Sequence, residues 1–479
     1  MDVRKIKFGT DGWRGVIADD YTFESVRAVG RAIASYVLKH EDSKKGLVVG
    51  YDTRFSSKRF AEAISEELAA AGIWVRISDD YVPTPTISYA VKSLGTAGGV
   101  MITSSHNPWS WNGVKFKGAF GGSATPAQIH IIEQELYAGA APKNPGGKIE
   151  VVDFKKDYVA AITKLADLDK IQKANFRFAI DCMYGSGRNV LSGIFAQHGI
   201  DHVQIRADVN PLFPGINPEP IIPHVKALQD TAVSEKCDAG LVMDGDADRV
   251  GAVAGDGSFV DSHKCYAILL SWLLDFKKWP GAVTRAYNTT RMLDRIAAKH
   301  GRELIEHGIG FKYVTDIVMS GKEVLIGGEE SGGIGIPSHL PERDGILNSL
   351  LIANAMADYG KTLKELVDDL QAEYGQHHYG RRDLTIPENV KQDALRRAAA
   401  GPKKVGKYNV VSSGNLDGIK FYLDAPNNGG KDADTWVLLR ASGTEPLMRI
   451  YCEAASPEIV QEVLTAAVEF VHEKATAAQ

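Results

Sequence analysis

Cysteine is scarce in this chain, with only four among 479 residues. The four, Cys182, Cys237, Cys265 and Cys452, are scattered and form neither a Cys-x-x-Cys pair nor a disulfide framework, so we expect them to be reduced and buried. The first residues contain no apolar segment like that of a signal peptide, and no hydrophobic run approaches the length of a membrane span. We therefore expect a cytoplasmic protein that has no membrane partner.

The chain also lacks a large excess of either charge and several familiar fingerprints. Its 55 basic and 60 acidic residues give a net charge of −5, which argues against a general nucleic-acid binder. No Gly-x-Gly-x-x-Gly follows a strand and no Gly-x-Ser-x-Gly occurs, so neither a dinucleotide-binding fold nor an α/β-hydrolase is indicated. Residues 401–407 nearly match a nucleotide P-loop, but Tyr408 replaces the metal-binding Ser or Thr. The adjacent His377 and His378 are not spaced as metal ligands, and we expect them in a linker.

What is present is a repeated α/β pattern in a chain too long for a single core. A strand-like run at 46–49 precedes a helical spacing of apolar residues from Phe60 to Leu68, and similar patterns restart at 176–180 and 281–286. After about residue 375 the pattern changes to short strands, a turn at 427–430 and a final helix from Pro457, which predicts a smaller α+β domain. The expected domains are the following: 1–155, 156–262, 263–373 and 374–479.

A polar segment ends one of the predicted strands. The apolar run 99–102 leads into Thr103-Ser104-Ser105-His106-Asn107-Pro108, which places hydroxyl, imidazole and amide groups at a sheet edge, where sites in α/β folds tend to lie. Ser105 is therefore a candidate nucleophile, and His106 and Asn107 are candidates for orienting it. An ordinary turn whose polar side chains satisfy their own backbone remains the alternative.

Three aspartates follow a second predicted strand. Asp244-Gly245-Asp246-Ala247-Asp248-Arg249 comes directly after the apolar run that ends at Met243. Alternate carboxylates with small residues between them suit Mg²⁺ or Ca²⁺, since zinc prefers nitrogen and sulfur. An EF-hand loop is excluded, because its sixth position would be Arg249 rather than glycine. Three crowded carboxylates repel one another unless a cation lies among them, and Arg249 suggests a phosphoryl group beside the metal.

Two further loops are candidate substrate sites. Gly327-Gly328-Glu329-Glu330-Ser331-Gly332-Gly333 would allow Glu329 and Ser331 to bind paired hydroxyls, although a glycine-rich connector with solvated glutamates is the alternative. The strand ending in Arg440-Ala441-Ser442-Gly443-Thr444, with Arg449 further on, offers guanidinium, hydroxyl and backbone N–H groups. These are the components of a phosphate-binding nest.

In the same order and with comparable spacing, these blocks closely resemble those of the α-D-phosphohexomutase family, the phosphoglucomutases and phosphomannomutases. Three further segments resemble family signatures: Phe8-Gly9-Thr10-Asp11-Gly12-Trp13-Arg14-Gly15, Gly50-Tyr51-Asp52-Thr53-Arg54 and Asn112-Gly113-Val114-Lys115. The resemblance covers nearly the whole chain. It implies four domains around a central cleft, of which the first three share an α/β fold with mixed sheets.

The resemblance also implies a set of roles for individual residues. Ser105 would carry the transferred phosphoryl group and help Asp244, Asp246 and Asp248 to hold Mg²⁺. Lys115 would be the general base, although it could equally lie on a solvated strand face, and His106 and Arg14 would complete the catalytic set. The remaining candidates would bind the sugar phosphate: Arg249, Lys312, Glu329, Ser331, Arg440, Ser442, Gly443, Thr444 and Arg449.

The activity expected from these parts is the interconversion of a hexose 1-phosphate and a hexose 6-phosphate through phosphoserine, with glucose 1,6-bisphosphate as intermediate and activator. In members that act on mannose or glucosamine the sugar loop usually ends in Ser-Gly-His, whereas here Gly333 replaces the histidine. We therefore expect glucose to be preferred, with mannose or glucosamine as alternatives. A Mg²⁺-dependent sugar phosphatase and a non-catalytic sugar-phosphate sensor remain rival classes, and nothing in the sequence indicates an oligomeric state.

Overall fold

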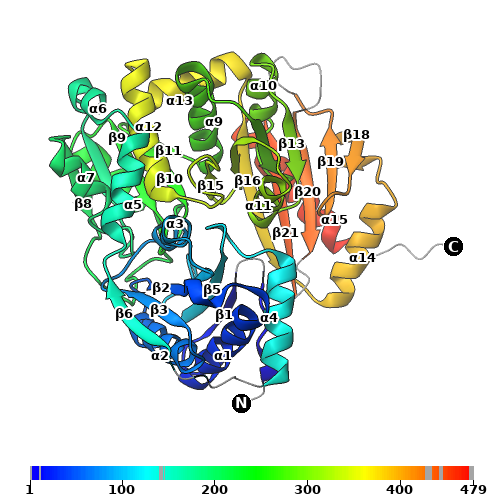
Figure 1. Ribbon diagram of the computed structural model, residues 1–479. Coiled ribbons are helices and arrows are strands. Elements are labelled where there is room, and N and C mark those ends of the chain that lie inside the picture. The colour runs from blue at the N-terminus through cyan, green and yellow to red at the C-terminus, as the bar shows by residue number, and fades with distance from the viewer. Residues whose placement is uncertain are drawn as a thin grey trace. The chain divides into compact units, whose positions relative to one another are not determined.

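The computed structural model describes residues 3–9, 12–139, 144, 146–426, 434–441 and 446–473. The chain forms two compact units, the first made of Met1–Thr284 with Gly310–Leu366 and the second of Arg285–Ile309 with Val367–Gln479. Figure 1 shows the elements of both. Within the described ranges, no helix has the length and hydropathy that crossing a membrane requires.

The first unit begins with a six-stranded mixed sheet. β2 is parallel to β3 and β4, whereas β5 is antiparallel to β1 and β4, giving the order β1-β5-β4-β2-β3-β6. Because β2 and β4 are parallel neighbours, the segments that follow them emerge at the same sheet edge. The strands are β1 (Trp13–Val16), β2 (Leu47–Tyr51), β3 (Trp74–Ser78), β4 (Gly98–Ile102), β5 (Trp111–Gly118) and β6 (Lys148–Val152).

Helices cover both faces of this sheet (Figure 1). Alternation along β2 and β4 decides which residue faces which layer: Val49 and Val100 join the core under α1, α2 and α4, whereas Val48 and Met101 join the core under α3. Thr22 caps α1 by a reciprocal capping box with Ser25. The helical elements are η1 (Val3–Lys5), α1 (Phe23–His40), η2 (Ser43–Lys45), α2 (Ser57–Ala70), α3 (Thr84–Leu94) and α4 (Pro126–Ala138).

A second mixed sheet follows in the order β11-β10-β9-β7-β8. β7 is parallel to β8 and β9, and β10 is antiparallel to β9 and β11. Its elements are α5 (Lys155–Ile162), η3 (Thr163–Leu165), α6 (Leu168–Ala174), β7 (Phe178–Asp181), α7 (Leu191–Gln197), β8 (His202–Ile205), α8 (Lys226–Ser234), β9 (Ala239–Met243), β10 (Val250–Ala254) and β11 (Phe259–Val260). The fully buried β9 delivers the chain directly into Asp244.

The third α/β region is shared between the units, because their boundary lies inside β12. In the first unit, β15 is antiparallel to β14, and Asp344 caps α12 by accepting from Leu347 N at 2.9 Å. The elements are α9 (Ser262–Trp272), η4 (Leu273–Lys277), β12 (Ala282–Ala286), α10 (Met292–Lys299), β13 (Leu304–His307), α11 (Lys312–Met319), β14 (Val324–Gly328), β15 (Ile334–Gly335), α12 (Gly345–Tyr359) and α13 (Leu363–Tyr374).

The C-terminal part of the second unit is an antiparallel sheet in the order β16-β21-β20-β19-β18-β17. Apolar residues of β19, β20, β21 and α15 form its core. The elements are β16 (His378–Thr385), α14 (Glu388–Ala399), β17 (Lys404–Val405), β18 (Tyr408–Gly414), β19 (Ile419–Leu423), β20 (Trp436–Ala441), β21 (Leu447–Ala454) and α15 (Pro457–His472).

The expected fold class is confirmed, with three mixed-sheet α/β domains followed by a smaller antiparallel domain. The final helix begins at Pro457 as predicted, and all four cysteines are buried. The linker expected at the two histidines is wrong for His378, which begins β16, whereas His377 does lie in the connection between α13 and β16, buried with Nδ1 3.2 Å from Glu453 Oε1. The predicted turn at 427–430 lies outside the described residues, and the domain boundaries stay predictions.

Candidate active site

The predicted nucleophile lies in a tight, buried loop after β4. Ser105 is 1% exposed and has a φ of 51°, a left-handed conformation that non-glycine residues seldom adopt. Thr103 Oγ1 accepts from Ser105 N at 2.9 Å and helps to form the turn. Ser105 Oγ donates to Asp244 Oδ2 at 2.7 Å, so the serine loop meets the acidic loop of the second domain.

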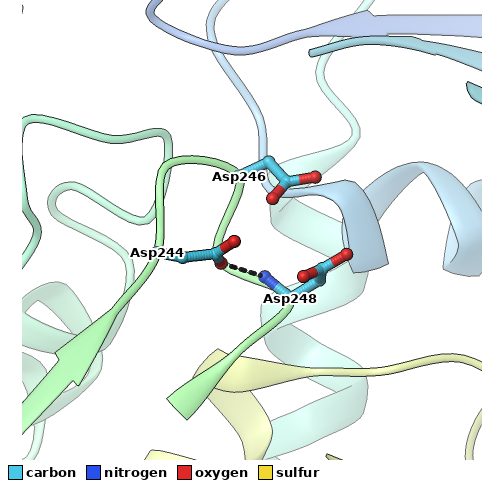
Figure 2. A group of neighbouring side chains, drawn as sticks. All are labelled: Asp244, Asp246 and Asp248. Carbon is cyan, nitrogen blue, oxygen red and sulfur yellow. Dashed lines mark hydrogen bonds between the residues drawn. The ribbon is translucent and has the colours of Figure 1, made fainter. Parts of the chain in front are cut away.

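The three aspartates of the acidic loop converge (Figure 2). All three are completely buried, and one carboxylate oxygen from each lies within 4.8 Å of the others. Asp244 Oδ1 accepts from the backbone N–H groups of Asp248 and Arg249 at 3.0 and 3.1 Å, which folds the loop back on itself. In the part of the chain that the structure describes, Asp244, Asp246 and Asp248 are the group of acidic, histidine or cysteine side chains close enough together to hold a metal ion.

The donors fit a hard divalent cation. Asp246 Oδ1 and Asp248 Oδ1 are buried and have no hydrogen-bond partner among the described residues, although buried carboxylate oxygens normally have one. Burial, together with the charges of Asp246 and Asp248, raises the pKa of Asp244 well above its usual range. An oxygen-only set with mutual repulsion suits Mg²⁺ or Ca²⁺ and does not suit zinc.

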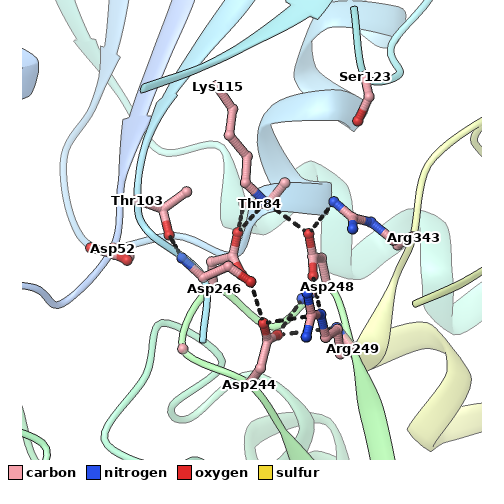
Figure 3. A network of polar contacts seen from close by, with 12 residues as sticks. Asp52, Thr84, Thr103, Lys115, Ser123, Asp244, Asp246, Asp248, Arg249 and Arg343 are labelled. Carbon is pink, nitrogen blue, oxygen red and sulfur yellow. Dashed lines mark hydrogen bonds and ion pairs between the residues drawn. The ribbon is translucent and has the colours of Figure 1, made fainter. Parts of the chain in front are cut away.

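Two basic side chains contact the same carboxylates (Figure 3). Lys115 Nζ, from β5, lies 2.8 Å from Asp246 Oδ2 and 2.9 Å from Asp248 Oδ2. Arg343 Nη2 lies 2.8 Å from Asp248 Oδ2. Burial opposes ionisation of Asp246, but Lys115 and the hydroxyl of Thr84, 2.6 Å from Asp246 Oδ2, outweigh it and hold its pKa below the usual range. The solvated strand face considered for Lys115 is therefore wrong.

Arg343 is the residue that the sequence did not reveal. It is 5% exposed, and its Nη1 lies 3.4 Å from Glu329 Oε2, so it joins the acidic loop to the sugar loop. The preceding Glu342 is held by Lys117 Nζ at 2.5 Å and by Ser123 Oγ at 3.0 Å. The available signal was Glu342-Arg343-Asp344, three charged residues placed just before an apolar helix.

The sugar loop, Gly327 to Gly333, places the carboxylate of Glu329 next to Arg343. Burial raises the pKa of Glu329 to about 7, and the charge of Arg343 opposes that shift. A Cβ atom on Gly333 would lie 2.4 Å from Arg343 Cδ and 3.2 Å from Glu329 Oε2. The absence of a side chain at position 333 therefore makes room for Arg343. Ser331 lies in the same loop and is half-buried.

Arg249, the residue after Asp248, directs its guanidinium back toward the carboxylates of the acidic loop. Its Nε lies 3.9 Å from Asp244 Oδ2 and 4.0 Å from Asp248 Oδ1, and its Nη1 lies 3.6 Å from Glu219 Oε1. Burial acts to lower the pKa of Arg249, but the three carboxylates outweigh burial and raise it. A permanent positive charge thus lies beside Asp248 and beside Asp244, the residue that accepts from Ser105 Oγ.

Three other predicted residues of the first unit, His106, Arg14 and Lys312, lie in the serine loop, in β1 and at the start of α11. His106 follows Ser105, and burial with the charges of Arg249 and Arg14 lowers its pKa well below the usual range, so its ring is neutral at pH 7. Arg14 Nη1 donates to Asn107 Oδ1 at 2.8 Å and thereby contacts the serine loop. Lys312 begins α11, with its Nζ 5.2 Å from the ring centroid of Tyr313.

The second unit contains the two predicted phosphate-binding arginines. Arg440 in β20 and Arg449 in β21 are directly opposite each other in the antiparallel ladder. Like charges at such a position destabilise a strand pair unless acidic groups or an anion compensate them. Arg440 Nε lies 2.8 Å from Asp417 Oδ1, and Arg449 Nε lies 3.8 Å from Asp383 Oδ2. The other predicted members of this loop, Ser442, Gly443 and Thr444, lie outside the described residues.

Comparisons with known proteins agree with these features. Family profiles of the phosphoglucomutase/phosphomannomutase domains match in order: domain I at 5–142, domain II at 156–257, domain III at 261–374 and the C-terminal domain at 428–470. A phosphoglucomutase/phosphomannomutase of Thermococcus kodakarensis is 30% identical over 470 residues, 97% of this chain and 98% of that protein. A phosphoglucosamine mutase of Limosilactobacillus reuteri is 31% identical over 462 residues, covering 95% of each chain.

A solved structure shows the same arrangement. The crystal structure of a protein of Thermus thermophilus, provisionally named a phosphomannomutase, superposes with a TM-score of 0.85 at 35% identity and covers 98% of this chain and 99% of that one. With four family domains matched in order and relatives aligned end to end, the chain belongs to the α-D-phosphohexomutase (phosphoglucomutase/phosphomannomutase) family and is a phosphohexomutase, an intramolecular phosphotransferase.

Proposed function

We propose that this phosphohexomutase interconverts glucose 1-phosphate and glucose 6-phosphate, with phospho-Ser105 as the phosphoryl donor and glucose 1,6-bisphosphate as the intermediate. The observation that supports this most directly is the contact of Ser105 Oγ with Asp244 Oδ2 at 2.7 Å, beside three buried carboxylates whose oxygens lie within 4.8 Å. A phosphorylatable hydroxyl next to a hard-cation site and a buried guanidinium is what phosphoryl transfer requires.

Asp244, Asp246 and Asp248 would hold Mg²⁺, together with an oxygen of the Ser105 phosphoryl group. When bound, the ion neutralises charge on the transferred group. Arg249 adds a second positive charge from the protein itself, 3.9 Å from Asp244. His106, which is neutral, and Arg14, which reaches the loop through Asn107, would shape the surroundings of the serine.

In the first half-reaction the bond from phosphorus to Ser105 Oγ breaks as a bond from phosphorus to a sugar oxygen forms. The sugar hydroxyl loses one proton and Ser105 Oγ gains one, so the exchange is balanced. We propose Lys115 as the group that accepts the proton of the sugar. Its Nζ lies 2.8 Å from Asp246 Oδ2 and 2.9 Å from Asp248 Oδ2, so these carboxylates position Lys115 beside the acidic loop that Ser105 contacts.

The bisphosphate must then reorient and return its other phosphate to Ser105. Glu329 and Ser331 would bind ring hydroxyls in both orientations. Arg440, Ser442, Gly443, Thr444 and Arg449 would bind the phosphate that is not being transferred, with Lys312 as a further phosphate contact. The cross-strand pair supports an anion there, because Arg440 and Arg449 bring two positive charges to directly opposite positions of one ladder.

The glucose preference rests on position 333. This chain has Gly333 where the resemblance leads us to expect histidine in mannose- and glucosamine-specific members, and the side chain of Arg343 lies where a Cβ at position 333 would be. The named relatives include both phosphoglucomutase/phosphomannomutase and phosphoglucosamine mutase, so kcat/KM for glucose, mannose and glucosamine 1-phosphates is the measurement that decides the sugar. A higher kcat/KM for either of the other two would overturn the preference.

Ser105→Ala, with peptide mass spectrometry of the wild-type protein, tests the mechanism. The wild-type peptide that contains Ser105 should carry phosphate after incubation with glucose 1,6-bisphosphate, and the alanine variant should show no exchange between the two glucose phosphates. Ser104→Ala, the neighbouring serine, is the matched control and should stay active. Mutase activity in Ser105→Ala would contradict the proposal. Release of inorganic phosphate faster than isomerisation would favour a phosphatase.

A further inference from the structure

A buried ion pair follows β2, next to the serine loop. β2 and β4 are parallel, with Tyr51 opposite Ile102, so the residues after the two strands lie side by side. The side chains of Asp52 and Arg54 are 0% exposed, and Arg54 Nε lies 3.2 Å from Asp52 Oδ2. A completely buried arginine is costly unless its charge and its donors are satisfied.

Arg54 directs its donors to the backbone of the serine loop. Its Nη2 donates to the carbonyl oxygens of Ser105 at 2.6 Å and Asn107 at 2.7 Å. Its Nη1 donates to those of Pro108 at 2.9 Å and Trp111 at 3.1 Å. A guanidinium has five N–H groups, so four of them hold one loop and the fifth faces Asp52.

The loop needs such an anchor because its central residue is strained. Ser105 has a left-handed φ of 51°, a conformation that persists only where the surroundings enforce it. Ser105 and three residues that follow it turn four carbonyl groups toward one buried guanidinium, and repulsion among these oxygens would open the turn without it. The fork of Arg54 satisfies those oxygens together, which a lysine with a single ammonium cannot do in the same geometry.

We propose that Arg54 is the positioning residue of the phosphoryl-carrying serine. It holds the backbone from Ser105 to Trp111, and through that backbone it directs Ser105 Oγ toward Asp244. Because it binds carbonyl groups, it keeps the loop in one shape whether or not Oγ carries phosphate. This inference rests on the proposed role of Ser105, and it adds a residue that contacts neither the sugar nor the acidic triad.

The second domain offers a matched control. Asp181 is the last residue of β7 and is completely buried, and Arg206 donates from Nε to Asp181 Oδ1 at 2.9 Å and from Nη2 to the carbonyl of His224 at 3.0 Å. This is also a buried aspartate paired with an arginine at the end of a parallel strand. Its acceptors all belong to the second domain.

The experiment compares Arg54→Lys with Arg206→Lys. For each we would measure the melting temperature, kcat and KM for glucose 1-phosphate, and the single-turnover rate of phosphate transfer from Ser105. Arg54→Lys should lower kcat and the transfer rate by about a hundredfold, the effect of misplacing a reacting group by about 1 Å, with KM within about twofold. Arg206→Lys should lower the melting temperature comparably but leave kcat within about threefold.

Several results would overturn the inference. One is a kcat for Arg54→Lys within threefold of the wild type, and another is an equal loss of kcat in Arg206→Lys. If Arg54→Lys does not fold, Asp52→Asn keeps the guanidinium but removes its charge partner, and a wild-type kcat there would count against the anchor. Ser105→Ala separates the two proposals: an active Ser105→Ala contradicts the proposed function, whereas an inactive one beside a fully active Arg54→Lys contradicts only the role of Arg54.

Discussion

The serine loop and the acidic loop are both buried turns after a parallel strand, and both are held by cations, but in different ways. In the serine loop, Arg54 binds backbone carbonyl groups and leaves the reactive side chain of Ser105 out of its contacts. In the acidic loop, Lys115 and Arg343 bind the carboxylates themselves. The contacts of Arg54 therefore fix the backbone conformation of the serine loop, whereas those of Lys115 and Arg343 balance the negative charge of the acidic loop.

The difference matters for how each loop can respond to ligands. A shape held through the backbone need not change when phosphate joins the side chain. In the acidic loop, Lys115 Nζ contacts Asp246 Oδ2 and Asp248 Oδ2 at 2.8 and 2.9 Å, so a divalent ion bound to the same two carboxylates would share their negative charge with Lys115. We therefore expect substitutions in the acidic loop to change metal dependence, and substitutions around the serine loop to change the rate of transfer.

The largest effect should come from the acidic loop itself. Asp246→Ala removes a ligand and leaves Lys115 with one carboxylate, so we expect kcat/KM to fall by about ten-thousandfold, in line with the several kcal/mol that a metal ion supplies to phosphoryl transfer. Activity titrated against Mg²⁺, with and without EDTA, checks this. Asp256→Ala, an exposed aspartate of the same domain, is the control and should behave as wild type. If Asp246→Ala kept the Mg²⁺ dependence of the wild type, the assignment of the three aspartates as metal ligands would be wrong.

Lys115→Met should have the next largest effect and a more specific signature. Losing the proton-transfer group should lower kcat by about a thousandfold. Taking the ammonium away from buried Asp246, while Asp248 keeps Arg343, should also destabilise the protein by about 3 kcal/mol. Because no ammonium then competes for those oxygens, Mg²⁺ should raise the melting temperature of the variant more than that of the wild type.

Lys117→Met is the matched comparison for this prediction. It also removes a buried lysine from β5, but its partner is Glu342, at 2.5 Å. The melting temperature should fall in this variant too, and Mg²⁺ should not restore it preferentially. If Mg²⁺ stabilised both variants equally, Lys115 would not share its carboxylates with the metal.

Arg343 joins the acidic loop to the sugar loop, and weakening it should have an intermediate effect. Arg343→Lys keeps the charge but loses the fork that reaches both Asp248 and Glu329, so we expect about a hundredfold lower kcat/KM. Gly333→Ala should act in the same direction, because its Cβ would meet Arg343 Cδ at 2.4 Å. Gly193→Ala, where nothing lies within 4 Å of the added Cβ, is the control. Full activity in Gly333→Ala would show that the space at position 333 has no consequence.

The sequence revealed part of this site and missed the rest for a physical reason. Ser105 and the aspartates stand in short motifs after strands, where local order and residue type suffice. The contacts that balance their charges join residues far apart in the chain: Lys115 lies 131 residues from Asp246, and Arg343, which follows the sugar loop, contacts Asp248 of the acidic loop. Such pairs depend on how the domains pack, which no local pattern encodes.

In the fold, too, local sequence patterns predicted individual helices and strands but not the contacts between distant residues. Helix α15 and strands β2, β4 and β12 begin within one residue of the predicted segments, because apolar periodicity and flanking glycine or proline mark them. The linker prediction missed that His378 begins β16 and that His377, in the connection before it, is buried, because adjacent histidines are also typical of a polar connector. In the structure His377 is a buried partner of Glu453, and the carboxylate, though burial opposes its ionisation, is held by His377 at a pKa below the usual range.

The smallest effect should come from Glu329, and it should depend on pH. Glu329→Gln removes a charged acceptor for ring hydroxyls, a loss of about 1.5–3 kcal/mol, or roughly ten- to a hundredfold in kcat/KM. Burial raises the pKa of the wild-type carboxyl to about 7, so the charge is present above that pH and is lost below it. The ratio of wild-type to variant kcat/KM should therefore be largest at pH 8 and shrink by pH 6.

Stability should change in the opposite sense, which makes the prediction sharper. A raised folded-state pKa means that the contribution of Glu329 to folding is fully present below the unfolded pKa of about 4.5 and is lost as the pH rises through about 7. Relative to Glu329→Gln, the melting temperature of the wild type should thus fall between pH 5 and pH 8 while its catalytic advantage grows. Glu330→Gln, the half-buried neighbour, should show neither trend. If activity and stability rose together with pH, Glu329 would be acting as an ordinary structural carboxylate and the sugar contact would have to be assigned elsewhere.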